Sequence, residues 1–120
     1  KMDPAQMLAH CGNALEVAAG DKVRKQALIG KLLGRFVKGS LLGQKPFSRN
    51  SPTDPTFVIT GERNFASERK RLGSLIDRFS SEGAKACDSR MHSFFGRLEG
   101  DEWGVLMYKH LDHHLQQFGA

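Results

Sequence analysis

Two histidines four residues apart, His110 and His114, lie in a stretch whose pattern predicts one amphipathic helix over residues 103–118. At helical spacing they fall in the middle of its apolar face, beside Trp103 and Met107. Side chains at positions i and i+4 of a helix lie one above the other, so both imidazoles can reach the same metal ion. Because histidine is the commonest metal ligand, the spacing indicates a metal site on this helix.

The same pattern has a purely structural interpretation. A single histidine on an apolar face is usually a buried, hydrogen-bonded imidazole, although each buried ring needs a partner or lowers stability. His113 lies at the border of the apolar face and is a poorer ligand candidate. The opposite face is expected to point to solvent, with Lys109 as one of its members. This helix alone leaves both interpretations open.

With 120 residues, the chain is long enough for one core and one domain, residues 1–120. Few prolines and few β-branched residues favour helices. No apolar run is long enough to span a bilayer and no signal peptide is visible, so we expect no membrane span. The cysteines, Cys11 and Cys87, do not form a disulfide framework, which favours a reduced, cytoplasmic setting.

Earlier in the chain, the pattern predicts three further helical stretches. The first begins at Asp3, the expected N-cap, and ends near Gly20. His10 lies on the flank of its apolar stripe, a boundary position. The second and third cover residues 26–42 and 62–84, and residues 40–61 and 84–100 are expected to be connecting loops. We interpret the aliphatic residues of the second stretch as core, with its glycines permitting close packing.

Residues 22–53 carry a basic block without one acidic residue: Lys22, Arg24, Lys25, Lys31, Arg35, Lys38, Lys45 and Arg49. Such a block can bind nucleic acid, acidic lipid or an anionic ligand, but more often it is a solvated face. Few aromatic residues and no known reading motif argue against nucleic acid as a partner. The alternative to a metal-dependent activity is nevertheless a non-catalytic helical domain that binds nucleic acid or another polyanion through residues 22–49.

Several short motifs together resemble a known family. They are the ending His110-Leu-Asp-His113-His114-Leu-Gln-Gln-Phe118-Gly119, the segments Phe94-Phe95-Gly96 and Glu102-Trp103-Gly104, and the opening Lys1-Met2-Asp3-Pro4 with Met7-Leu8-Ala9-His10-Cys11. The chain resembles a bacterial subfamily of the DinB/YfiT-like superfamily, whose members are small four-helix proteins, many without an assigned activity. The resemblance implies a single DinB-like domain, an all-α, up-and-down four-helix bundle. It also implies a further helix before Lys1, so the first helix of the bundle is expected to be missing from this chain. The apolar face left open would favour a homodimer.

The resemblance also implies a metal site made by His10, His110 and His114. Three imidazoles leave one coordination position open, as in catalytic metal sites, and they suit Zn²⁺ and Ni²⁺. Because the superfamily includes thiol-dependent transferases, the resemblance implies a metal-dependent transferase or hydrolase acting on a small molecule, with a low-molecular-weight thiol as co-substrate. The catalytic residues remain unassigned. Glu68, His92, Tyr108 and His113 are candidates for supporting the ligands. A third interpretation treats the triad as vestigial in a structural protein.

Overall fold

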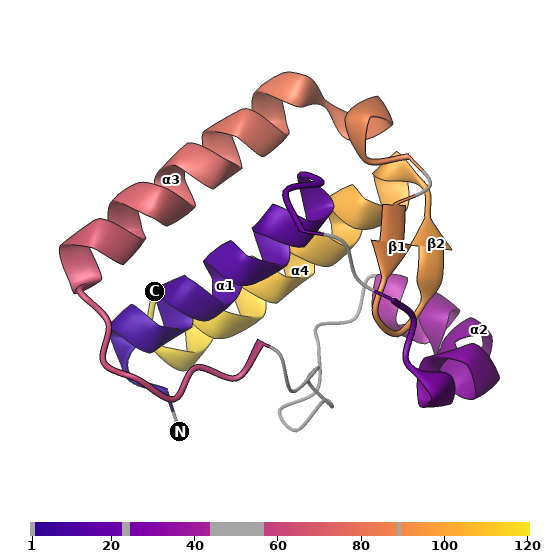
Figure 1. Cartoon of the computed structure of the whole chain (residues 1–120), viewed down its shortest axis with the longest axis horizontal. Coiled ribbons are helices and arrows are strands. Elements are labelled where there is room, and N and C mark those ends of the chain that lie inside the picture. Colours follow the sequence, from indigo (N-terminus) through magenta and orange to yellow (C-terminus); the bar gives the residue numbers. More distant parts are fainter. Residues whose placement is uncertain (1, 23–24, 44–56, 89) are drawn as a thin grey trace.

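The computed structural model describes residues 2–22, 25–43, 57–88 and 90–120, and this part of the chain is mostly helical (Figure 1). In chain order its elements are α1 (Pro4–Ala18), α2 (Leu28–Leu42), α3 (Phe65–Glu82), the short 3-10 helix η2 (Ala84–Cys87), β1 (Arg90–His92), β2 (Gly96–Leu98) and α4 (Gly100–Gln117). The predominantly helical class is confirmed. Figure 1 shows α1, α3 and α4 lying side by side, with α2 at one end beside the strands. The finer prediction of an up-and-down four-helix bundle stays a prediction.

Helix α1 begins where the sequence predicts. Asp3 is its N-cap and accepts a hydrogen bond from the Gln6 main chain, while the Gln6 side chain accepts one from the Asp3 main-chain N–H. This reciprocal capping box satisfies two N–H groups that a helix start leaves unpaired. After the helix ends, Gly20 adopts a φ of 86°, a left-handed conformation that glycine adopts without strain. Local sequence therefore determines both ends of α1.

The core is built around α1, which lies between α3 and α4. α3 runs along one side of it in the same direction, and α4 runs along another side in the opposite direction (Figure 1). Buried apolar residues from all three helices meet there: Met7, Leu8, Cys11, Leu15, Leu72, Leu75, Trp103, Leu106 and Met107. Because α1 is contacted on several sides, most of its residues are buried, including His10, at 4% exposure. The boundary position predicted for His10 is therefore wrong.

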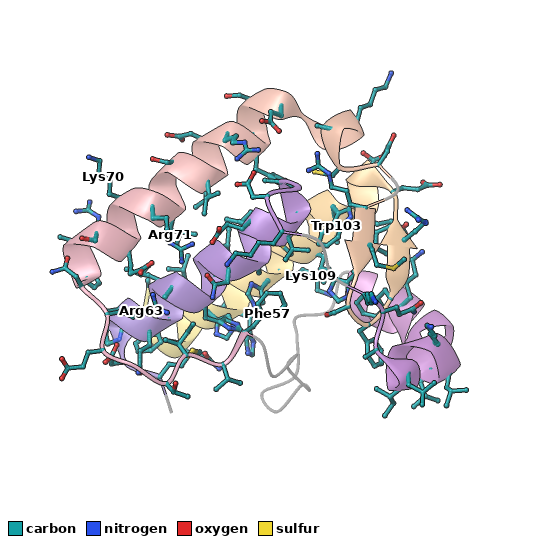
Figure 2. All side chains as sticks on the ribbon, viewed as in Figure 1. Phe57, Arg63, Lys70, Arg71, Trp103 and Lys109 are labelled. Atoms are coloured by element: carbon teal, nitrogen blue, oxygen red, sulfur yellow. The ribbon has the colours of Figure 1, made fainter. Side chains whose placement is uncertain are left out.

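Arg71 connects α3 to α1. Its guanidinium donates to the Ala9 carbonyl at 3.0 Å and to Asn13 at 3.2 Å, and it forms ion pairs with Glu16 and Glu68. Figure 2 shows the side chain reaching from α3 toward α1. A planar guanidinium with five N–H donors can serve several acceptors at once. Arg71 therefore fixes how α3 lies on α1.

A small antiparallel hairpin interrupts the connection predicted between residues 84 and 100. Strand β1 pairs with β2, with Arg90 opposite Leu98 and His92 opposite Gly96. Trp103, 1% exposed, donates its indole N–H to the Arg90 carbonyl at 3.3 Å and so ties α4 to the hairpin. The strict all-α assignment needs this correction. Strands of three residues are too short for an alternating pattern to reveal.

The second helix departs from the sequence interpretation. Its apolar residues were expected in the core, yet four of those whose side chains the structure describes are exposed: Leu28 at 75%, Ile29 at 58%, Leu32 at 67% and Leu33 at 47%. The side chains of Phe36 and Val37, which belong to the same prediction, lie outside the described part of the chain. The face that does pack is the glycine face. A Cβ atom on Gly34 would lie 2.6 Å from the carbonyl oxygen of Phe94, and one on Gly30 would lie closer still. The expected close packing through glycines is therefore present, and the partner of α2 in this packing is the hairpin.

Part of the long connection before α3 lies outside the described residues. This applies to Lys45, Arg49 and the rest of residues 44–56, so the predicted loop over 40–61 is described only at its two ends. α2 ends at Leu42, the predicted end of the second helical stretch, and so takes up the first three residues of that predicted loop. Among the described helices, none has the length and apolar character required to cross a membrane.

Candidate metal centre

His10, His110 and His114 come together between α1 and α4. One potential ligand atom from each residue can be chosen such that all three lie within 4.8 Å of one another. His10 Nε2 is 2.9 Å from His110 Nε2, and the ring of His114 lies 4.7 Å from each of the other two rings, centroid to centroid. The group is largely shielded from solvent, since His10 is 4% and His114 9% exposed. The structure thus brings together the three residues that the sequence analysis selected.

One of these separations is close to what a tetrahedral metal requires. With Zn–N bonds of 2.0–2.1 Å, two ligating nitrogens lie about 3.3 Å apart. The 2.9 Å between His10 Nε2 and His110 Nε2 is a few tenths of an ångström shorter. The three ligand atoms together lie within 4.8 Å, so the rings would have to adjust to bind one ion. Whether the triad binds a metal stays a prediction.

The orientation of His10 is set by the main chain. Its Nδ1 lies 2.8 Å from the carbonyl oxygen of Phe57, and because a carbonyl only accepts, Nδ1 must carry the proton. The lone pair of the ring is then on Nε2, the atom that approaches His110. Metal-bound histidines usually donate their second ring N–H to a carbonyl or carboxylate in this way. Phe57 also places its own ring edge-on to His10, with centroids 6.3 Å apart.

Burial keeps the three imidazoles uncharged. It lowers the pKa of His10, partly opposed by the hydrogen bond to the Phe57 carbonyl. It lowers the pKa of His110 well below the usual value, and the neighbouring histidines, His10 foremost, add to this effect. It also lowers the pKa of His114, partly opposed by the hydrogen bond that His114 donates to the Gln117 side-chain oxygen. Neutral imidazole is the form that binds metals, so protons compete weakly for this site at neutral pH.

The four residues that the sequence suggested as supports for the ligands, Glu68, His92, Tyr108 and His113, differ in their contacts and exposure. Glu68 is buried but pairs with Arg71 at 2.9 Å and Arg63 at 3.5 Å. His92 lies in the hairpin, where its Nδ1 accepts hydrogen bonds from the main-chain N–H groups of the two phenylalanines that follow. Tyr108 is 71% exposed. Of these four candidates, His113 lies against the triad, with its ring 5.1 Å from that of His114, centroid to centroid.

The sequence analysis missed three contributors around α4. Phe57 acts through its main-chain carbonyl, for which no side-chain pattern exists. Gln117 lies three residues after His114, a spacing that does bring two helical side chains together. Lys109 was expected to face solvent, but it is 8% exposed and donates to the Gly43 carbonyl at 2.8 Å, at the end of α2. The helical wheel of α4 could not show that α2 covers this second face.

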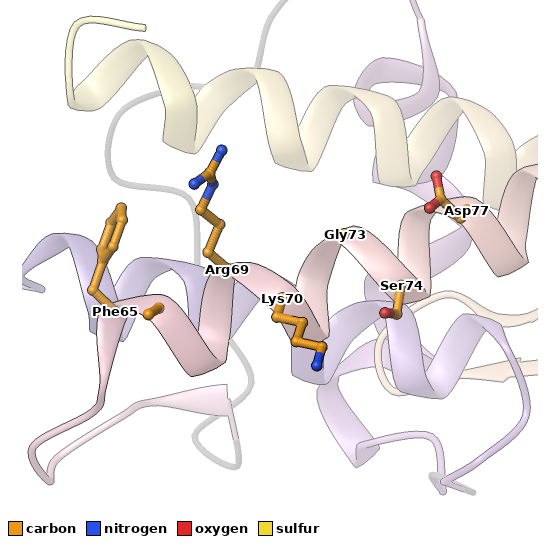
Figure 3. Close-up of a pocket in the computed structure, with 7 residues that line it drawn as sticks. Phe65, Arg69, Lys70, Gly73, Ser74 and Asp77 are labelled. Carbon is orange, nitrogen blue, oxygen red and sulfur yellow. The ribbon is translucent and has the colours of Figure 1, made fainter.

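A shallow open pocket elsewhere on the molecule does not involve the triad. It runs along α3 and is lined by Phe65, Ala66, Arg69, Lys70, Gly73, Ser74 and Asp77 (Figure 3). All of its lining comes from one helix, and no histidine or cysteine is among it. We therefore do not associate it with the candidate metal centre.

The basic segment is partly neutralised within the molecule. Lys38 lies 2.7 Å from Glu102 on α4, and Lys22 lies 3.8 Å from Glu16 on α1. Lys25 and Lys31 are exposed. Within the described residues, the basic segment therefore offers a polyanion fewer free charges than its composition indicates.

Comparison with known proteins places the chain in a family. Residues 2–120 match DUF1569, a protein family of unknown function, and the chain belongs to this family. No curated protein and no solved structure matches it. The triad therefore has to be interpreted from its own geometry.

Proposed function

We propose that this chain is a metal-dependent enzyme in which His10, His110 and His114 hold one divalent transition metal ion, Zn²⁺ or Ni²⁺. The observation that carries the proposal is the convergence of three imidazoles from two helices, with ligand atoms within 4.8 Å of one another. Three imidazole ligands leave a coordination position open, which distinguishes a catalytic metal site from a structural one.

Two helices and one main-chain carbonyl have separate roles in the proposed metal site. α4 presents two ligands from successive turns, and α1 supplies the third from the facing side. The Phe57 carbonyl holds His10 with its Nε2 lone pair available. Burial lowers the pKa of all three rings and so keeps them neutral near pH 7. A metal ion at such a site lowers the pKa of a bound water or thiol and so supplies a nucleophile at neutral pH.

For the reaction, we propose a transferase or hydrolase that uses a low-molecular-weight thiol or water as the nucleophile. The support is the arrangement of the triad, one histidine from an early helix and two from the last helix, as the DinB/YfiT-like resemblance implies. Membership of DUF1569 in that superfamily is part of this proposal.

The test is metal analysis of protein purified without an affinity tag and reconstituted with Zn²⁺, Ni²⁺ or Mn²⁺. We expect about one equivalent of metal in the wild type and its loss in His110→Ala and His114→Ala. Gln116→Ala is the matched control, because it changes a side chain on the exposed side of the same helix and should keep the stoichiometry. A wild type that takes up none of the three metals contradicts the proposal, as does undiminished metal in both triad variants.

A second measurement separates the proposal from the alternative function. Metal-loaded protein would be assayed for thiol transfer and ester or amide hydrolysis, with and without a chelator. Nucleic-acid binding that weakens steeply with salt but ignores the chelator would instead favour the polyanion-binding domain.

A further inference from the structure

The last turn of α4 holds a chain of hydrogen bonds that ends on a triad histidine. His114 Nδ1 lies 2.9 Å from Gln117 Oε1, and Gln117 Nε2 lies 3.2 Å from His113 Nε2. A carboxamide oxygen only accepts and its NH₂ only donates, so both partners have defined roles. His114 must donate from Nδ1, and His113 must accept at Nε2.

We infer that Gln117, held in place by His113, is a positioning residue for the candidate metal centre. By accepting the Nδ1 proton, Gln117 fixes His114 as the tautomer whose lone pair is on Nε2, the nitrogen left to ligate a metal. The inference rests on the proposed function, because it assigns Gln117 a role toward the same metal ion. Partners that orient a ligating imidazole typically change metal affinity 10- to 100-fold when removed.

The carboxamide has a direction, and this gives His113 its role. A Gln117 amide turned by half a rotation would present NH₂ to His114 Nδ1, which would then have to accept and leave its proton on Nε2. That tautomer cannot bind metal through Nε2. In the observed orientation the NH₂ group lies against His113 Nε2 and the oxygen against His114 Nδ1. His113, Gln117 and His114 are therefore linked by two consecutive hydrogen bonds.

The main chain at the end of α4 is closed by hydrogen bonds. The N–H groups of Phe118, Gly119 and Ala120 each donate to a carbonyl of Leu115 or Gln116, and Gly119 adopts a φ of 79°. Such an ending satisfies carbonyls that would otherwise lack a partner within the helix. The main chain that carries Gln117 is therefore hydrogen-bonded although Gln117 is the last residue of α4.

Two parallels support the assignment. The tautomer of His10 is fixed in the same way by a main-chain group, because its Nδ1 donates to the Phe57 carbonyl at 2.8 Å. The neighbouring Gln116 behaves differently, since its Nε2 donates to Asp112 at 2.9 Å on the exposed side of the helix. One glutamine of the pair is thus an ordinary surface residue and the other holds a buried imidazole.

The experiment compares three variants. Gln117→Met keeps the length and helix propensity of the side chain but removes both hydrogen bonds, Gln117→Glu keeps an acceptor for His114, and Gln116→Met is the matched control. Zn²⁺ affinity is measured by competition with a chromogenic chelator. The His114 tautomer is measured in metal-free protein by long-range ¹H–¹⁵N NMR correlation, and circular dichroism checks the helix content.

We expect Gln117→Met to weaken Zn²⁺ binding by roughly 10- to 100-fold and to shift His114 toward the Nε2–H tautomer. Gln117→Glu should stay near the wild-type affinity and tautomer, and Gln116→Met should match the wild type in both. His113→Phe, which keeps a ring beside His114 but loses the acceptor nitrogen, should weaken binding by a smaller factor in the same direction.

The two readouts keep this inference separate from the proposed function. If the wild type binds no Zn²⁺, the proposed function is wrong. The role of Gln117 in metal binding is then wrong too, whichever tautomer His114 adopts. If the wild type binds Zn²⁺ but Gln117→Met retains its affinity or its Nδ1–H tautomer, the positioning role is wrong while the metal site stands.

Discussion

The Nδ1 nitrogen of His10 lies 2.8 Å from the main-chain carbonyl oxygen of Phe57, 47 residues further along the chain. This contact joins the first helix to the segment that leads into α3. It fixes the proton of His10 on the side away from His110 and leaves the lone pair inside the triad. The segment itself is anchored by a second bond, from the Gln6 side chain to the Gly61 carbonyl at 3.0 Å. A connecting segment thus orients a candidate metal ligand through its backbone.

The stability of the metal-free protein should fall as the pH drops below about 6.5, the ordinary pKa of histidine. His10, His110 and His114 all have lowered pKa values in the folded state. The unfolded chain therefore binds more protons than the folded chain between pH 6.5 and those lower values, so acid favours unfolding there. Urea unfolding at pH 7.5 and pH 5.5 measures the difference. His110→Leu should show a weaker pH dependence, and an equal dependence in wild type and variant would contradict this account.

Replacing Arg71 should loosen α3 from α1. Arg71→Met removes the donor to the Ala9 carbonyl and leaves the buried Glu68 without its nearest cation, so we expect a loss of about 2 kcal/mol in the free energy of unfolding. Arg78→Met is the control. Arg78 pairs with Asp21 and Glu82 at an exposed site, where such pairs contribute little to stability, so we expect a smaller loss. Equal losses in the two variants would show that burial of the Arg71 network is unimportant.

Two glycines of α2 should respond oppositely to alanine. A Cβ on Gly34 would lie 2.6 Å from the Phe94 carbonyl oxygen, whereas one on Gly39 meets no atom within 4 Å. Gly34→Ala should push α2 off the hairpin, which faster amide hydrogen exchange across α2 would report. Gly39→Ala should slow that exchange, because alanine favours a helix interior by about 1 kcal/mol over glycine. Similar exchange in both variants would show that α2 does not pack on the hairpin through this face.

Truncating leucines on α1 and α2 should separate core from surface. Leu15 on α1 is 2% exposed, so Leu15→Ala should lower the free energy of unfolding by roughly 3 kcal/mol. Leu32 on α2 is 67% exposed, so Leu32→Ala should change the free energy of unfolding by less than about 0.5 kcal/mol. Chemical denaturation of both variants gives the comparison. A large loss for Leu32→Ala would show that its face is covered in solution.

Local sequence by itself determined the start of α1 and the pairing of His110 with His114. A cap at Asp3 and a histidine pair spaced at i and i+4 act within one or two helical turns, so neighbouring residues suffice to specify them. The predominantly helical class followed for the same reason. The positions of the ligands on α4 were therefore readable before any tertiary contact was known.

Tertiary structure alone decided which faces are covered. His10 looked like a boundary residue because the wheel of α1 does not show that α4 packs beside it. Lys109 looked solvent-facing because nothing local reveals that the end of α2 covers it, and Leu32 looked like core although its face is open. The Phe57 carbonyl carries no side-chain signature at all. A periodic pattern reports the apolar side of one element, whereas burial depends on neighbours supplied by distant parts of the chain.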